Sequence, residues 1–493
     1  MKARALVPLV ASLGLLAMLT GCSDSASVSS SSGAATSTTS SRTGSTGPGG
    51  NGGGSGSSSV SYSAVNEYST STTVTGETIA STGKDEEAVL VDNSNANVVL
   101  NNCTVSRDNA SSTGGDNSSF YGVGADALVT NGKLFVKGGT YTTNAKGGAG
   151  VFAYSDGAAY VKDAVVSTKL STSGGLHAAG GGTLYGWNNT VTTQGESSAA
   201  IRSDRGGGTM RINGGTYTSN GTGSPAIYCT ADIEVSSATL SANGSEAFCL
   251  EGKNSTSLFD CSLTGAMPDT NSQNEGLQWN VIVYQSMSGD AVSGTGNFKM
   301  VGGTLTAATG GMLYTTNTTS EFLLDGVTVK NSGTNDFLMR CTGNQNGRGW
   351  GSVSSNGATT NFTARNETME GAIQWDYASK LDTYLVGSST WTGAVDLVTD
   401  DQGSATSGHG NLTIENGSKW IVTGDSVLTT LNNAGAIEDT SGRTVTVKTG
   451  STTLVNGTSP YTITVGSYST SADVSSALAT PTAETMTLPS QLS

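Results

Sequence analysis

One short segment gathers the kinds of side chain that sugar-binding sites use. Residues 341–350 read Cys-Thr-Gly-Asn-Gln-Asn-Gly-Arg-Gly-Trp. Trp350 offers a ring on which a sugar can stack, Arg348 offers a cation, and three amide side chains can hydrogen-bond to hydroxyl groups. The plainer interpretation is a surface loop whose Trp350 packs against the protein. The candidate ligand-binding residues are Arg340, Asn344, Asn346, Arg348 and Trp350.

A second group of reactive side chains lies near residue 400, where Asp400 and Asp401 precede Gly-His-Gly at 408–410. This string resembles the aspartate pair and Gly-His-Gly motif of polygalacturonases, which in that family lie on successive turns of the backbone. Only eight residues separate Asp401 from His409, so we expect His409 elsewhere on the same turn. The carboxylates of an inverting hydrolase must face each other at about 6.5–9.5 Å. We therefore predict no catalytic residue, and a polysaccharide lyase or glycoside hydrolase stays an alternative hypothesis.

The N-terminal residues have the pattern of a bacterial export signal. Two basic residues precede an apolar stretch at 5–18 that is too short to cross a membrane comfortably. The next residues, Leu-Thr-Gly-Cys at 19–22, resemble the lipobox of bacterial lipoproteins. The resemblance implies removal of a signal peptide at 1–21 and a lipid on Cys22, which would anchor the protein outside the cytoplasm on the cell membrane or outer membrane. A plain secretory peptide or a transmembrane helix is the alternative.

Residues 22–60 are the predicted lipid-anchored linker. After Cys22 the chain consists almost entirely of Ser, Gly, Thr and Ala, a composition that cannot bury enough apolar surface to fold. As a random coil this tether spans about 35 Å on average, and roughly 125 Å when stretched. We expect it to keep the folded part of the chain close to the membrane but off its surface.

A four-residue pattern recurs along the folded part of the chain. Examples are Gly-Gly-Thr-Tyr at 138–141 and 214–217 and Asn-Asn-Thr-Val at 188–191. The third residues of successive copies from Thr140 to Ser262 are 25, 25, 26, 23 and 23 positions apart. A period of this length indicates stacked repeats, each of which is one turn of a solenoid.

The residues around each copy alternate between apolar and variable, as in half-buried strands. Apolar residues occur six and four positions before the third residue and one position after it, as in Met210, Ile212 and Tyr217. Another strand follows about ten residues later. Its predicted buried column is Val151, Leu176, Ile201, Ile227, Phe248, Ile282, Met312 and Phe337. Each repeat therefore has three short strands, and successive repeats are expected to pair in parallel and in register.

This period and pattern resemble the right-handed parallel β-helix superfamily (pectate-lyase-like) over residues 90–465. The predicted fold class is all-β, a right-handed parallel β-helix of three sheets with about 23–26 residues per repeat. The resemblance implies no particular activity, because pectin-cleaving enzymes, phage tailspikes and non-catalytic adhesins share the fold. The predicted parts are a cap region at 61–95, a β-helix at 96–374, C-terminal rungs at 375–465, and a tail at 466–493 that caps the end, with a short helix near 472–479, or is disordered.

Two insertions interrupt the period, at about 265–280 and 341–361. We expect them to flank the sheet that the later strand of each repeat forms, and insertions in solenoids usually border the binding face. The outward residues between the insertions are predicted to be Val283, Leu313, Leu338 and Arg340.

Another exposed face is rich in hydroxyl groups. The third residue of the pattern and the residue two positions later are Thr or Ser in most repeats, as in Thr190/Thr192 and Thr216/Thr218. Such ranks resemble those of β-solenoid ice-binding proteins. Contact with a glycan or another surface is a second interpretation. The third is that these residues have only a structural role, because Thr has a high β propensity and suits an exposed strand.

Composition narrows the range of partners. The formal net charge is −15 and no basic stripe occurs, so nucleic acid is not an expected partner. The cysteines form no CxxC pair and no Cys/His cluster, and we predict no metal site and no cofactor. The cysteines beyond Cys22 are either small buried apolar residues or include one disulfide within 229–261. They are Cys103, Cys229, Cys249, Cys261 and Cys341.

The leading hypothesis is a lipid-anchored, adhesin-like cell-surface protein without catalytic activity. Its partners would be the membrane, through the lipid on Cys22, and a glycan or a host or neighbouring surface. A purely structural spacer in the cell envelope is a further alternative.

Overall fold

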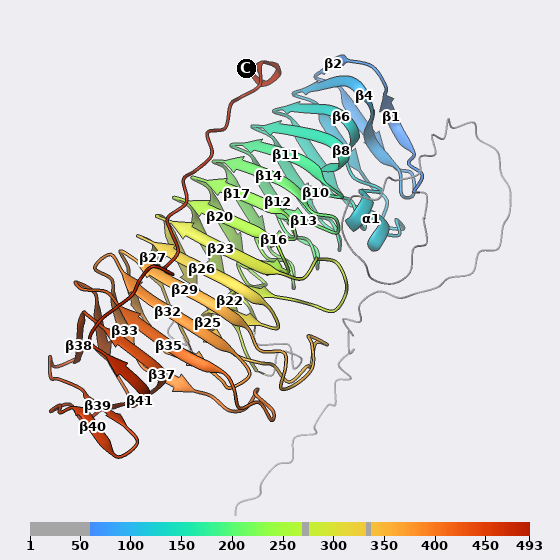
Figure 1. The fold of residues 1–493 in the computed structure, drawn as a ribbon. Helices are drawn as coiled ribbons and strands as arrows, with labels where there is room; N and C mark the ends of the chain where they lie inside the picture. The colour runs from blue at the N-terminus through green and yellow to red at the C-terminus, as the bar shows by residue number, and fades with distance from the viewer. Residues whose placement is uncertain (1–59, 269–275, 332–336) are drawn as a thin grey trace, which may run out of the picture. The chain divides into compact units, whose positions relative to one another are not determined.

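The computed structural model describes residues 60–268, 276–331 and 337–493, and these residues form an all-β parallel β-helix. Strands of successive repeats pair in parallel and in register around one apolar core (Figure 1). The predicted fold class is therefore confirmed. The predictions for the signal peptide, for Cys22 and for the linker up to residue 59 fall outside the described residues.

The strands of the solenoid lie on three faces. Face I comprises β2 (Thr72–Thr75), β11 (Gly182–Trp187), β14 (Gly208–Asn213), β17 (Asp232–Ser236), β20 (Ser255–Phe259), β23 (Thr295–Val301), β26 (Thr319–Asp325), β29 (Thr359–Arg365), β32 (Lys380–Val386) and β35 (His409–Ile414). Face II comprises β3 (Thr78–Ser81), β5 (Thr104–Arg107), β7 (Thr140–Thr143), β9 (Val165–Thr168), β12 (Thr190–Thr193), β15 (Thr216–Ser219), β18 (Thr239–Ala242), β21 (Ser262–Gly265), β24 (Thr304–Ala307), β27 (Thr328–Lys330), β30 (Thr368–Glu370), β33 (Thr390–Gly393), β36 (Lys419–Val422) and β38 (Ala436–Asp439).

Face III follows face II along the chain. It comprises β1 (Ala64–Tyr68), β10 (Leu176–Ala179), β13 (Ile201–Ser203), β16 (Ile227–Cys229), β19 (Phe248–Glu251), β22 (Trp279–Tyr284), β25 (Gly311–Thr316), β28 (Met339–Cys341), β31 (Ile373–Trp375) and β34 (Val395–Leu397). Long strands continue from face III into face I, namely β4 (Glu87–Asn101), β6 (Ala127–Lys137), β8 (Val151–Lys162) and β37 (Ser426–Asn433). The last strands are β39 (Thr446–Thr449), β40 (Thr452–Val455) and β41 (Thr462–Ser469).

The recurring sequence pattern marks the corner between faces I and II. Its first residue adopts a left-handed backbone conformation from β5 to β33, with φ between 49° and 67°. Gly, Asn, Asp and, less readily, Ser tolerate this conformation, which explains why the pattern begins with them. The residues are Asn102, Gly138, Asp163, Asn188, Gly214, Ser237, Asp260, Gly302, Gly326, Asn366 and Ser388.

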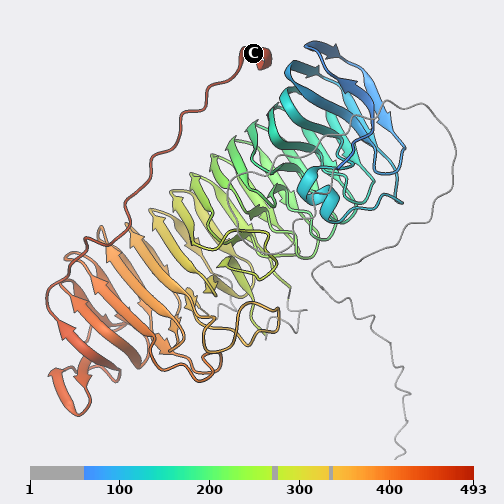
Figure 2. The same ribbon diagram turned by 45° about the vertical axis from the view of Figure 1, so that its right-hand side comes forward.

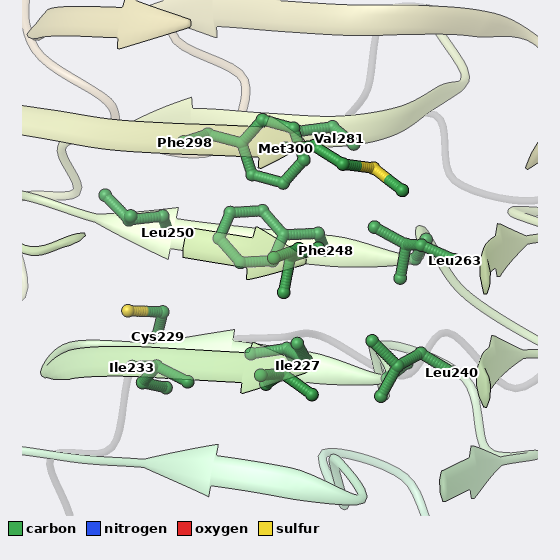
Figure 3. Packing of buried hydrophobic residues seen from close by; sticks show 14 of the residues in the cluster. Ile227, Cys229, Ile233, Leu240, Phe248, Leu250, Leu263, Val281, Phe298 and Met300 are labelled. Carbon is green, nitrogen blue, oxygen red and sulfur yellow. The ribbon is translucent and has the colours of Figure 1, made fainter. Parts of the chain in front are cut away.

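The core consists of columns of like side chains, because in-register pairing places equivalent residues above one another. Leu176, Ile201 and Ile227 are successive register partners on face III, and Phe248 follows them. All four are fully buried, and Figure 3 shows Ile227 and Phe248 among the neighbouring core residues. The predicted column is confirmed as far as Phe248.

Beyond Phe248 the predicted column is wrong. It continues through Val281, Leu313, Met339 and Ile373. Ile282, Met312 and Phe337 are offset from it by one or two residues, and Ile282 and Phe337 belong to an apolar cluster on the outer side of face III. When a strand is apolar on both sides, the alternation of apolar and polar residues does not show which residues point into the core. The strands beyond Phe248 are of this kind, because the insertions cover the outer side of face III there.

The two ends of the chain add detail to this fold, and the C-terminal end differs from prediction. Within residues 61–95, which were predicted to be a cap region, β1, β2 and β3 form a first repeat that pairs with β4 and β5. Residues 470–493 neither form the predicted helix near 472–479 nor cap the end. They run back along face I toward the N-terminal repeats and end in a 3₁₀ turn, η2 (Ser490–Leu492) (Figures 1 and 2).

Candidate functional site

The outward side chains of face III form one column across ten strands. They are Phe152, His177, Arg202, Tyr228, Cys249, Ile282, Tyr314, Arg340, Gln374 and Asp396. Of the residues predicted to point outward between the insertions, only Arg340 belongs to this column. Val283, Leu313 and Leu338 lie in the inner core, because the strand register is shifted from the predicted one.

A second apolar core covers the middle of this column. Its buried members are Cys249, Met267, Trp279, Ile282, Tyr284, Tyr314 and Phe337, and Tyr228, Leu277 and Trp350 pack against it. Met267 and Leu277 come from the first insertion and Trp350 from the second. The described residues of both insertions therefore pack onto the outer side of face III, whereas the insertions were predicted to flank this sheet; residues 269–275 of the first insertion fall outside the described residues.

The second insertion, which we call the 342–358 loop, is fixed by two buried asparagines. Asn344 Nδ2 donates to Thr316 Oγ1 at 2.9 Å and to the carbonyl oxygen of Trp350 at 3.2 Å. Asn356 Nδ2 donates to the carbonyl oxygens of Asn344 at 2.8 Å and Trp350 at 3.1 Å. Asn344 was predicted to bind ligand, but its side chain is only 5 % exposed. Sequence reasoning missed Asn356, because a single Asn in a Ser-rich loop carries no signal of burial.

The loop places a cation over two indole rings. Arg348 Cζ lies 5.2 Å from the ring centre of Trp350 and 5.8 Å from that of Trp279, within the range of a cation–π interaction. Trp350 also packs on Tyr284, with ring centres 4.5 Å apart. Arg348 and Trp350 are partly exposed, and Asn346 is exposed. Three of the five predicted ligand-binding residues thus gather on one surface.

Arg340 is held inside the protein rather than offered to a ligand. It is 8 % exposed, its Nη2 lies 2.5 Å from Asp401 Oδ2, and its Nη1 donates to Gln374 Oε1 at 2.6 Å. Asp376 accepts from the amide of Gly343 at 2.8 Å beside this pair. Burial raises the pKa of the Asp376 carboxyl above its ordinary value, and Asp401 adds to the shift.

A charged cluster fills the N-terminal part of the column. Arg202 Nε lies 2.8 Å from Asp204 Oδ2, and His177 Nε2 lies 3.6 Å from the same oxygen. The short helix α1 (Asp116–Tyr121) lies against this cluster, and Ser119 Oγ accepts from Arg202 Nη2 at 3.0 Å. Burial lowers the pKa of His177 to about 4. The imidazole is therefore neutral at neutral pH.

Between α1 and the 342–358 loop, Glu251 is surrounded by hydroxyl groups. Tyr228 and Tyr284 donate to Glu251 Oε2 at 3.1 and 3.3 Å, and Ser286 donates to its other oxygen. Burial raises the pKa of Glu251. No sequence pattern pointed to this group, because its members come from three different repeats.

The residues that resemble a hydrolase motif lie at separate places. Asp401 is paired with Arg340 on face III. His409 begins β35 on face I, where its Nε2 lies 3.6 Å from Asp382 Oδ2. Asp400 is exposed.

Face II carries the predicted ranks of hydroxyl groups. One rank, in register along β7 to β24, is Thr140, Val165, Thr190, Thr216, Thr239, Ser262 and Thr304. A parallel rank is Thr142, Ser167, Thr192, Thr218, Ser241, Thr264 and Thr306. All these side chains are partly or fully exposed, and Val165 interrupts the first rank.

The cysteines of the described residues are free thiols. Cys103, Cys229, Cys249, Cys261 and Cys341 are all buried, so the alternative of a disulfide within 229–261 is not what the structure shows. Over the described ranges, no group of three or more His, Cys, Asp or Glu side chains is placed to hold a metal ion. The same ranges contain no helix with the length and apolarity that a membrane span requires.

Comparison with known proteins does not extend this description. No family model, no curated protein and no solved structure matches the chain.

Removing the Asn356 side chain should loosen the 342–358 loop without unfolding the solenoid. Asn356→Ala leaves the carbonyl oxygens of Asn344 and Trp350 with fewer donors, a local cost of about 1–3 kcal/mol. We expect trypsin to cleave after Arg348 at least about five times faster, while the melting temperature of the solenoid changes little. Ser352→Ala, at an exposed position of the same loop, is the matched control. Equal cleavage rates in the two variants would contradict the role of Asn356.

Proposed function

We propose that this chain is a lipid-anchored cell-surface protein that binds a glycan through the 342–358 loop and does not act as an enzyme. In this proposal it is an adhesin-like member of the pectate-lyase-like β-helix superfamily. The observation that carries the proposal is the placement of Arg348 over the rings of Trp279 and Trp350, beside the exposed Asn346.

The rigidity of the loop supports a binding role. A loop that is already ordered loses little conformational entropy when a ligand binds. The buried side chains of Asn344 and Asn356 fix the loop through hydrogen bonds, and Trp350 packs against the second apolar core. The side chains above are therefore presented in one arrangement, which favours recognition of one ligand shape.

The sequence outside the described residues fits the same function. The lipobox at 19–22 and the Ser/Gly-rich linker would place the solenoid at the cell surface while leaving it free to reorient. A ligand on a neighbouring cell or in a surrounding matrix is then within reach of face III.

Glycan binding should depend on the loop surface. We expect residues 61–493 to be retained on a glycan array or on mucin, and Arg348→Ala to weaken retention at least about tenfold, or about 1.4 kcal/mol. Thr192→Ala, a half-exposed change on face II, should leave retention unchanged. Trp350→Ala should also abolish binding, with circular dichroism showing an intact solenoid.

The outcomes separate the alternatives. No retention on any glycan surface would contradict the proposal and favour a structural envelope spacer. Retention could instead be abolished by Thr192→Ala and other changes on face II but not by Arg348→Ala. That result would show that the binding site lies on face II.

Lipid anchoring has its own test. Cys22→Ser removes the thiol that a lipid would modify, so we expect loss of radiolabelled palmitate from the protein and its release from the membrane fraction of the cell. Cys103→Ser, which changes a buried thiol of the solenoid, should leave labelling unchanged. Labelling of the Cys22→Ser protein would contradict the predicted anchor.

One observation favours the enzyme alternative. Asp396 follows Gln374 in the outward column of face III, near the Arg340–Asp401 pair, and burial raises the pKa of its half-buried carboxyl. A carboxyl with a raised pKa is suited to general acid catalysis. Cleavage of pectin or alginate by the 61–493 protein, lost in Asp396→Asn, would establish this second function.

A further inference from the structure

Residues 470–493, which we call the strap, cross face I from the C-terminal repeats to the N-terminal ones (Figures 1 and 2). Asn361 Nδ2 on β29 donates to the carbonyl oxygen of Ser476 at 2.7 Å. At the other end, Lys162 Nζ on β8 donates to the carbonyl oxygen of Leu492 at 3.3 Å. The strap thus contacts repeats that are far apart in the stack.

The end of the strap is buried on the outer side of face I. Leu492 is fully buried although it belongs to no strand. It packs with Phe135 of β6 and Trp187 of β11. Apolar residues that pack against this cluster are Val99, Tyr160, Tyr185, Met486 and Leu488. Leu492 therefore lies in a cluster to which β4, β6, β8 and β11 all contribute.

The aromatic residues under the strap have a geometry that suits apolar side chains. Phe135 and Tyr160 stack with ring centres 4.9 Å apart and planes at 13°, and Tyr160 and Tyr185 stack at 5.2 Å and 6°. The faces of rings stacked in this way are covered by their neighbours, so a sugar cannot lie flat on them. Met486, Leu488 and Leu492 fill the surface that the rings leave.

Ionic contacts hold the middle of the strap. Arg211 Nε on β14 lies 2.7 Å from Glu484 Oε2. Glu234 on β17 accepts from the amide of Glu484 at 2.7 Å. Arg211 also pairs with Asp232 at 2.6 Å. Glu484 is therefore positioned both by its side chain and by its backbone.

Polar contacts continue toward the C-terminal repeats. Thr363 Oγ1 accepts from the amide of Leu478 at 2.9 Å, and Arg365 Nη2 donates to the carbonyl oxygen of Leu478 at 3.1 Å. Thr480 donates to Asp325 on β26. These bonds attach the strap at intervals to successive strands of one face.

The strap changes how a solenoid can unfold. In a repeat array each repeat contacts only its neighbours, so unfolding normally starts at an exposed end and proceeds one repeat at a time. The repeats that contain β4, β6 and β8 are tied across face I to a segment that is anchored near β29. Opening them requires Leu492 to leave its site first.

We propose that the strap is a locking device that keeps the N-terminal repeats closed. While Leu492 and Glu484 are docked, the repeats from β4 to β8 open only together with release of the strap. This holds whether or not the loop on face III binds a glycan, so the two proposals can fail separately.

Hydrogen exchange of the complete chain tests the lock. Leu492→Asp places a charge in the apolar site, and we expect amides of β5 and β7 on face II to exchange at least about tenfold faster. These strands belong to the repeats that contact Leu492 but lie on a different face from the strap, so a merely local contact would not affect them. Ser490→Asp, an exposed change in the same 3₁₀ turn, should leave their exchange unchanged.

A second variant avoids the buried site. Glu484→Arg places a second positive charge beside Arg211 at an exposed position, and Thr485→Arg is the matched control. We expect exchange in β5 and β7 to rise severalfold only in Glu484→Arg. The proposal is overturned if faster exchange in both Leu492→Asp and Glu484→Arg stays confined to residues 470–493. It is also overturned if each variant matches its control.

Discussion

In-register stacking of the backbone is the constraint on which every other feature depends. A left-handed residue at each corner between faces I and II starts the next strand at the same height in every repeat. Equivalent side chains then become vertical neighbours, which makes an apolar column inside and ranks of similar side chains outside. The hydroxyl ranks of face II and the mixed column of face III are both consequences of this registration.

The features that repeat with the period of the sequence could be predicted from the sequence. The strands of face II and the column from Leu176 to Phe248 follow from alternation and from Gly, Asn or Asp at the corners. The register beyond Phe248 was mispredicted because Trp279–Tyr284 is buried on both sides, so alternation gives no phase. The path of the strap was also missed, since scattered residues such as Met486, Leu488 and Leu492 show no regular spacing.

The candidate site could be predicted only in part, because its polar side chains pair with residues that are distant in the sequence. Residue types placed Arg348, Trp350 and Asn346 on one loop, and the structure brings them to one surface. Types alone could not show that Arg340 is paired with Asp401, 61 positions away, or that Asn344 is a buried support. Long-range partners of polar groups are set by the stacking of repeats, and local sequence does not encode them. The same stacking lets a loop and a strap pack on two different faces of one core.

Disulfide trapping on face II tests the stacking most directly. Thr192 and Thr218 are register partners in adjacent strands, whereas Thr192 and Ser241 are two strands apart. Adjacent in-register residues lie about 4.8 Å apart, within the range that a disulfide spans, and residues two strands apart do not. The account predicts that Thr192→Cys with Thr218→Cys forms an intramolecular disulfide on mild oxidation, while Thr192→Cys with Ser241→Cys does not. A disulfide in the second pair and none in the first would contradict the registration on which the structure rests.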